Sequence, residues 1–280
     1  MPCISTPTFN NLVKPKTVFP FLGIFFISAL LCLPYSLLHG QLSPDSIASV
    51  WKNPSIPNQE RFKAFEQYYQ NMISSSPIDV VGSSEQHWML ANASQSKKEM
   101  AIAMDNKAHA LCLLGEYDDA VRAIKDAYRI SMELNDSLAM ASKQANIGTI
   151  YYYQSKYQEA VQYFNTGLSI YQGTKEELKE ADILNNLGLV FLAINSYQLA
   201  EDYFQRTLHF YQKHEKDTLI GNIWLNLGVT YFEMGQITEA QHHAEKALQI
   251  FQKTNNEIGR ADCHQLFANI YELEGRVDKA

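Results

Sequence analysis

From about residue 101 onward, apolar positions recur along the chain at the spacing of an α-helix face. Apolar or small side chains return every three or four residues, which aligns them on one side of a helix. In the segment 184–191 these positions are Leu184, Leu187, Gly188 and Phe191. Asn195 then supplies a residue type that tolerates the left-handed backbone in which many helices end. A second apolar stripe follows. The pattern predicts a helix, a short turn, a second helix and a polar connection.

This two-helix unit repeats with a period of 40 residues, and the alignment of the units needs no gaps. A glycine inside a helix costs ~1 kcal/mol relative to alanine. We therefore expect glycines in the first helix to lie where two helices cross closely, with a bulky neighbouring side chain filling the space. Two columns of small residues keep the register: Gly148, Gly188 and Gly228 in the first helix, and Ala120, Ala160, Ala200 and Ala240 in the second.

One unit contains a recognisable sequence motif. The segment "WLNLGVTY", residues 224–231, has Trp224, Leu227, Gly228 and Tyr231 in the order W-x2-L-G-x2-Y. It resembles the signature of the tetratricopeptide repeat family. The period is longer than the ~34 residues usual in that family, as in its longer-repeat branch, and the closing proline is missing. The resemblance covers about residues 101–280. It implies an all-α fold, a right-handed α-solenoid of antiparallel helix pairs with four full repeats and a fifth incomplete one.

Residues 41–100 are expected to form capping helices that include a degenerate first repeat. Ser43 and Pro44 have the residue types of a helix start, and two later prolines interrupt that helix. An amphipathic helix is predicted over about 62–72 and a weaker one over about 84–99. The layout is similar to the exported sensory regions of bacterial nucleotide cyclases and histidine kinases that contain tetratricopeptide repeats.

Residues 1–40 have the composition of an export signal or a membrane anchor. Lys14 and Lys16 precede the uncharged run 18–38, and the most apolar part of this run is shorter than the ~20 residues of a spanning helix. The cleavage signal near Gly40 is poor. A cleaved signal and an uncleaved anchor through residues 18–38 both place the rest of the chain outside the cytoplasm, in the periplasm or another extracytoplasmic space.

The sequence stops inside the fifth unit. Ala280 falls where the second helix of that unit begins, so the apolar face of its first helix lacks the usual partner. Solenoids need polar terminal caps. We expect the chain to be the front part of a longer protein, or to cover this open end by self-association.

Catalytic and metal-binding motifs are absent from the sequence. A net charge of −7 without clustered basic residues argues against a nucleic-acid partner. Cys112 and Cys263 are isolated and fit small core positions. His242 and His243 are adjacent and project about 100° apart on a helix, so they cannot share a metal and are expected on a solvated face. The sequence predicts a non-enzymatic chain without cofactors; the question stays open for a longer protein that contains it.

An asparagine column is the candidate binding feature. Asn106, Asn146, Asn186 and Asn226 stand 40 residues apart, and each directly precedes a first-helix core position. One helical step is ~100°, so these amides point away from the packing inside the unit. The family resemblance implies that first helices line a concave wall and that such amides bind the main chain of a peptide, since an amide both donates and accepts. The alternative is that they brace neighbouring helices. Further residues expected on this wall are Tyr153, Asn185, Asn222, Glu233, His109 and Leu189.

Two functional hypotheses follow. The first is a peptide- or protein-binding module of an exported bacterial protein in signalling or scaffolding, with its partner in the concave groove. The second is the sensory region of a membrane-bound adenylate or guanylate cyclase, or of a sensor histidine kinase, whose catalytic domain lies beyond residue 280.

Overall fold

The computed structural model describes residues 43–275, so the predictions for residues 1–40 and 276–280 lie outside it. Within this range the chain forms twelve α-helices and no β-strand, which confirms the predicted all-α solenoid. The helices are α1 (Pro44–Lys52), α2 (Asn58–Met72), α3 (Pro77–Ala93), α4 (Lys97–Leu113), α5 (Tyr117–Glu133), α6 (Ser137–Tyr153), α7 (Tyr157–Tyr171), α8 (Glu177–Ala193), α9 (Tyr197–Lys213), α10 (Asp217–Glu233), α11 (Ile237–Lys253) and α12 (Glu257–Leu273).

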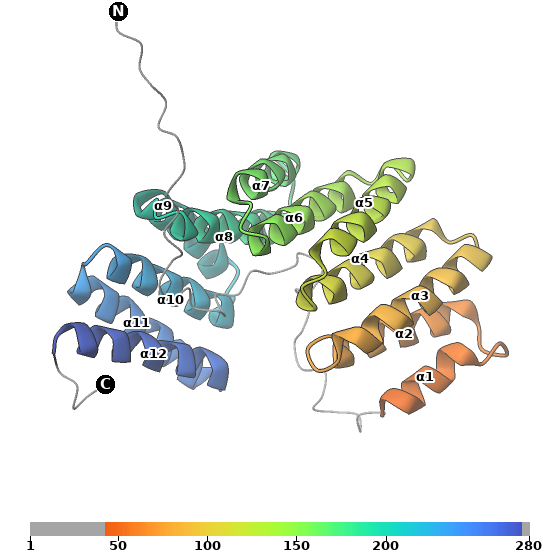
Figure 1. Cartoon of the computed structure of the whole chain (residues 1–280), viewed down its shortest axis with the longest axis horizontal. Coiled ribbons are helices and arrows are strands. Elements are labelled where there is room, and N and C mark those ends of the chain that lie inside the picture. Colours follow the sequence, from red (N-terminus) through yellow and green to blue (C-terminus); the bar gives the residue numbers. More distant parts are fainter. Residues whose placement is uncertain (1–42, 276–280) are drawn as a thin grey trace, which may run out of the picture.

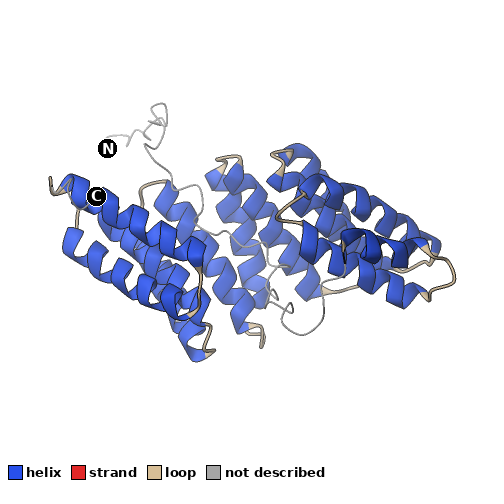
Figure 2. Ribbon diagram, turned by 90° about the horizontal axis from the view of Figure 1, so that it is seen from below, coloured by secondary structure: helices blue, strands red, loops and turns tan. Residues whose placement is uncertain are grey.

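The helices follow one another along an arch in chain order, from α1 at one foot to α12 at the other (Figure 1). Pairs α4–α5, α6–α7, α8–α9 and α10–α11 pack closely, and each second helix also packs on the first helix of the next pair. The view from below shows the helices lying side by side in a row (Figure 2). None of the helices of residues 43–275 has both the length and the hydropathy that crossing a membrane requires.

The helices are of nearly uniform length. From α3 to α12 each has 17 residues, except α7 with 15. A residue with positive φ closes each of these helices, and apart from Gly173 these residues lie 20 positions apart. From α3 to α11, except after Gly173, the next amide N–H donates to a carbonyl five residues earlier, as from Glu116 to Leu111 at 2.9 Å, the closure known as a Schellman motif. Two helices of this length, together with their two links, account for the 40-residue repeat period.

The glycine column lies at close helix crossings, as predicted. A Cβ atom built on Gly188 would stand 2.6 Å from the Phe204 ring, and one on Gly148 would stand 2.9 Å from the Phe164 ring. Both rings are fully buried. Each phenylalanine of the second helix therefore occupies the space that its own first helix leaves free at a glycine, and the core lies between the helices of each pair.

The amino-terminal helices differ from prediction at one place. The Ser43 side chain caps α1 by accepting from the Ser46 amide at 3.2 Å, as its residue type predicts. The weaker helix predicted over 84–99 is wrong, because α3 begins at Pro77 and ends at Ala93. Pro77 is the first residue of α3, where its fixed φ suits a helix start. Gln95 adopts φ of 55°, which ends the helix without a glycine or asparagine to signal it.

Candidate functional site

The first helices α4, α6, α8 and α10 carry the asparagine column, and a buried polar seam runs between them. Asp105 of α4 is the centre of its first part. The Asn146 side-chain amide of α6 donates to one Asp105 carboxylate oxygen at 3.0 Å, and the Lys143 ammonium of α6 binds the other at 2.8 Å. All three side chains are buried. Because a buried charge is tolerated only when it is paired and hydrogen-bonded, this triad fixes the register of α4 against α6.

The same arrangement recurs four helices later with uncharged groups. The Asn226 amide of α10 donates to the Asn185 side-chain oxygen of α8 at 3.1 Å, and the Asn185 amide lies 3.5 Å from the Asn186 oxygen. Asn185, Asn186 and Asn226 are buried, as is Asn106 at the start of the column. The column therefore contributes hydrogen bonds between successive repeats.

These contacts are those of the bracing alternative, and peptide binding by the column stays a prediction. Binding would also require access to these amides, and Asn146, Asn186 and Asn226 are buried in the free chain. A primary amide carries two N–H donors and an oxygen with two lone pairs, whereas the bond from Asn226 to Asn185 uses one donor of the first amide. A bond to the preceding repeat also fixes the side-chain rotamer, which orients the rest of the amide.

The other residues predicted for the inner wall differ in exposure. Tyr153 is 41% exposed, Glu233 is exposed, Asn222 is half-buried and Leu189 is buried. His109 bonds through Nδ1 to the Tyr69 hydroxyl at 2.6 Å. Burial lowers the pKa of His109 to about 4, so its imidazole is neutral at physiological pH. Sequence reasoning missed Asp105 and Lys143, whose signal was a pair of opposite charges almost one period apart.

The predicted solvated face at His242 and His243 is wrong for His243. Its ring is buried and lies between Tyr231, stacked at 4.9 Å, and Trp224, stacked at 5.1 Å. Burial lowers the His243 pKa to about 4. The histidine stands where the two preceding repeats place a tyrosine in an equivalent stacked pair: Tyr151 with Tyr163 at 5.2 Å and Phe191 with Tyr203 at 5.3 Å.

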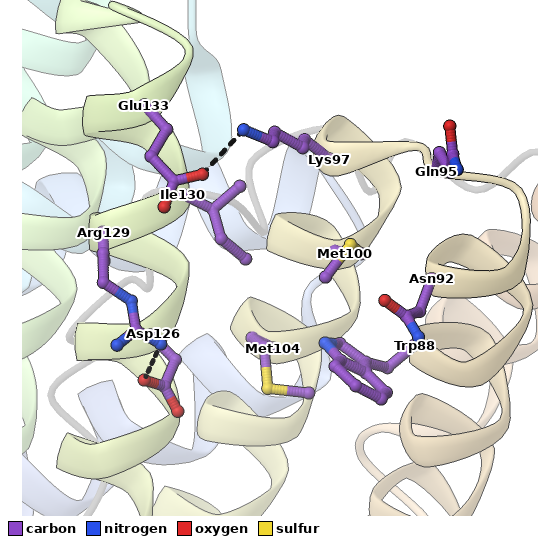
Figure 3. A pocket seen from close by; sticks show the side chains of 10 residues that line it. All are labelled: Trp88, Asn92, Gln95, Lys97, Met100, Met104, Asp126, Arg129, Ile130 and Glu133. Atoms are coloured by element: carbon purple, nitrogen blue, oxygen red, sulfur yellow. Dashed lines mark hydrogen bonds and ion pairs between the residues drawn. The ribbon is translucent and has the colours of Figure 1, made fainter.

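A hollow of about 760 Å³ lies outside the asparagine seam, between α3 and α5 over α4. Trp88 of α3 and Arg129 of α5 lie on opposite sides of it, and Met104 of α4 lies beside Trp88 with Met100 above (Figure 3). Ion pairs between Lys97 and Glu133 and between Asp126 and Arg129 stand at its rim. No sequence pattern indicated this hollow, because its walls come from three helices of two successive units.

Residues 43–275 provide neither a metal site nor an exposed thiol. This range holds no group of His, Cys, Asp or Glu side chains that could bind a metal ion. Cys112 and Cys263 are free and buried, as predicted for core residues, and burial raises the pKa of each thiol to about 12. Neither is a reactive thiolate at neutral pH.

Comparison with solved structures finds the same fold elsewhere. The chain is similar to BtubC (BKLC) from P. vanneervenii, with 19% identity, a TM-score of 0.64 and coverage of 74% of this chain and 87% of that one. It is similar to aspartyl phosphate phosphatase F from Bacillus subtilis, with 13% identity, a TM-score of 0.67 and coverage of 84% and 62%. A Rap protein complexed with Competence and Sporulation Factor has 14% identity, a TM-score of 0.56 and coverage of 84% and 66%. At sequence identities this low, the structural similarity shows a shared fold only.

Comparison with sequence families is more specific. No curated protein sequence matches the chain. A family profile described as "Tetratricopeptide repeat" matches residues 99–173, 139–213 and 219–280, which together are more than half of the chain. With the repeat signature and the helix pairs, this match shows that the chain belongs to the tetratricopeptide repeat family, whose fold is a non-catalytic scaffold for protein–protein interaction.

Proposed function

We propose that the wall formed by the first helices binds an extended segment of a peptide or protein, and that the asparagine column pairs with the main chain of that segment. The observation that carries the proposal is the recurrence of one amide at the same first-helix position in four consecutive units. A spaced row of amides suits an extended main chain, which offers donors and acceptors in regular alternation.

The bonds between repeats support this proposal. Asn146 is held by Asp105, and Asn226 is held by Asn185. An amide whose rotamer is already fixed loses less conformational entropy when a ligand binds. Bracing would thus preorganise the amides, and a ligand segment has to displace the groups that bury them in order to reach them. The Rap protein that shares the fold was crystallised with Competence and Sporulation Factor, which supports a peptide as the class of ligand here.

Selection from a display library of random peptides, followed by affinity measurement, tests the proposal. The double variant Asn146→Ala/Asn186→Ala should weaken a selected peptide ~10-fold or more, from ~1 kcal/mol for each lost hydrogen bond. Asn165→Ala, an exposed amide on α7, serves as the control and should change nothing. Equal affinity of the double variant and the wild-type chain, with helicity retained by circular dichroism, would exclude a role of the column in binding.

The proposal extends to location and context. The composition of residues 1–40 favours export, with the repeats in the periplasm or another extracytoplasmic space. Cell fractionation of the full chain, with amino-terminal sequencing of the mature protein, separates a cleaved signal from an anchor, and recovery in the cytosol would refute both. The second functional hypothesis, a sensory region of a cyclase or histidine kinase, is tested by reading the coding sequence downstream of Ala280 for a membrane span and a catalytic domain.

A further inference from the structure

Exposed apolar side chains lie on the edge of the solenoid where first helices end and second helices begin, and a separate group, Met132, Leu134 and Leu138, lies on the opposite edge. At the α4–α5 link, Leu113 is 50% and Leu114 is 38% exposed. At the α6–α7 link, Tyr153 is 41% exposed. The two links are neighbours, because the Tyr117 ring of α5 stacks on the Tyr153 ring at 6.5 Å and 5°, and the Gln154 amide donates to an Asp118 oxygen at 3.2 Å. They form one continuous surface.

The charge of this surface is one-sided. The segments 113–119 and 153–159 contain the acids Glu116, Asp118, Asp119 and Glu159 and a single base, Lys156. The Lys156 ammonium lies 5.7 Å from the Tyr151 ring centre. Asp119 pairs with Arg122 one turn further along α5. For Glu116 and Glu159 the part of the chain from 43 to 275 provides no ion-pair partner.

The opposite edge, where second helices end and first helices begin, has a different character. Acids and bases both occur there, and an ion pair joins the two helices in three of the four pairs from α4 to α11. Lys97 binds Glu133 at 2.8 Å, Lys213 binds Glu177 at 2.7 Å, and Lys253 binds Asp217 at 2.6 Å. Three acids on that edge are therefore neutralised by a lysine of the neighbouring helix, whereas within residues 43–275 no such pair joins α4 to α5 or α6 to α7 on the first edge.

We propose that the surface formed by Leu113, Leu114, Glu116, Tyr117, Asp118 and Tyr153, here called the aromatic–acidic edge, binds a protein segment that alternates basic and aliphatic side chains. Exposed apolar groups next to unpaired carboxylates gain most from a partner that covers the former and neutralises the latter. A guanidinium group also stacks favourably on an exposed tyrosine ring. The edge is distinct from the asparagine column, which is buried between the first helices.

A short fluorescent peptide of alternating arginine and leucine is the probe, and its anisotropy is measured with the full chain at physiological ionic strength. Leu113→Ser and Tyr153→Ala should each weaken binding by about fivefold to tenfold. Glu116→Gln/Asp118→Asn should do the same and should reduce the salt dependence. The matched control Glu176→Gln/Glu215→Gln removes the same charge from the opposite edge and should leave the affinity unchanged.

Several outcomes would overturn the proposal. An equal loss in the control pair would mean that net charge alone attracts the probe. Equally tight binding of an arginine–glycine peptide would exclude a contribution of the apolar side chains. A loss with Asn146→Ala/Asn186→Ala but none with Leu113→Ser would place the probe on the asparagine column, which would refute the edge while leaving the proposed function intact.

Discussion

The close approach of α8 and α9 at Gly188 predicts an unusual result for the substitution Gly188→Ala. Alanine favours the helix over glycine by ~1 kcal/mol, so helix propensity alone predicts stabilisation. The added methyl group, however, would stand 2.6 Å, 2.8 Å and 3.0 Å from three carbon atoms of the Phe204 ring. The ring is fully buried and has no space into which to move, because protein interiors are close-packed. Overpacking of this kind costs ~1–3 kcal/mol.

The two terms leave a net loss of about 1 kcal/mol for Gly188→Ala, with a range from zero to ~2 kcal/mol. Gly82 in α3 is the matched control, because a Cβ atom there meets no atom within 4 Å. Gly82→Ala should therefore show the propensity gain alone, ~1 kcal/mol of stabilisation. The two substitutions are chemically identical and differ only in what surrounds the new methyl group.

Urea unfolding followed by far-ultraviolet circular dichroism measures both variants. A double-mutant cycle with Phe204→Leu isolates the steric part, since the smaller side chain gives the methyl group room. We expect the Gly188→Ala substitution to be less costly in the Phe204→Leu background by ~1–2 kcal/mol. If Gly188→Ala stabilises the chain as much as Gly82→Ala does, the crossing is not tight and the packing account of the glycine column is refuted.

Three further predictions concern the backbone and buried titratable groups. Ser155→Gly should raise the free energy of unfolding by ~0.5–1 kcal/mol in the same assay, because Ser155 has φ of 58° and glycine adopts this conformation without strain; an unchanged urea midpoint would contradict this. Burial, with smaller contributions from nearby Lys246 and His242, lowers the His243 pKa to about 4. The chain should therefore lose up to ~3 kcal/mol of stability through His243 as the pH falls from about 6.5 towards 4. His243→Phe should abolish that loss, and an unchanged loss of stability at acidic pH in this variant would show that other groups cause it. Burial raises the Asp182 pKa to about 6 despite a hydrogen bond from Tyr211, so Asp182 should remove up to ~3 kcal/mol as the pH rises from about 3.8 to 6. Asp182→Asn should stabilise the chain at pH 7. In this variant the loss of stability that His243 causes at acidic pH should no longer be offset by protonation of Asp182. A destabilised Asp182→Asn chain at neutral pH would contradict the assignment.

The period and the core columns could be predicted from the sequence because each rests on local residue type. Gly188 and Ala200 are informative since few positions in a helix favour so small a side chain. The 20-residue spacing of the helix ends could not be predicted, because Gln95, Ser155 and Glu215 adopt the left-handed conformation without being residues that favour it. There the packing of whole helices determines the backbone.

The candidate site was predictable in part. The asparagine column follows from spacing, but its partners do not, since Asp105 and Asn185 belong to no column and act across repeats. His243 shows the same limit. Its neighbours in space are Trp224 and Tyr231, and only the tyrosines at the equivalent place in earlier repeats indicate that a ring belongs there. Because histidine is a polar residue type, His243 was predicted to face solvent, and the burial of its ring was missed.

The uniform closure of the helices has a consequence for how such a chain changes in length. Apart from Gly173, each left-handed residue from Gln95 to Asn255 is followed by the same short link and the same closing hydrogen bond. Two cuts at equivalent left-handed residues therefore leave ends of matching geometry, and a gene that copies or drops one unit rejoins helix to helix without needing a new loop. Recombination can lengthen or shorten the arch by whole units while each remaining helix keeps its neighbours.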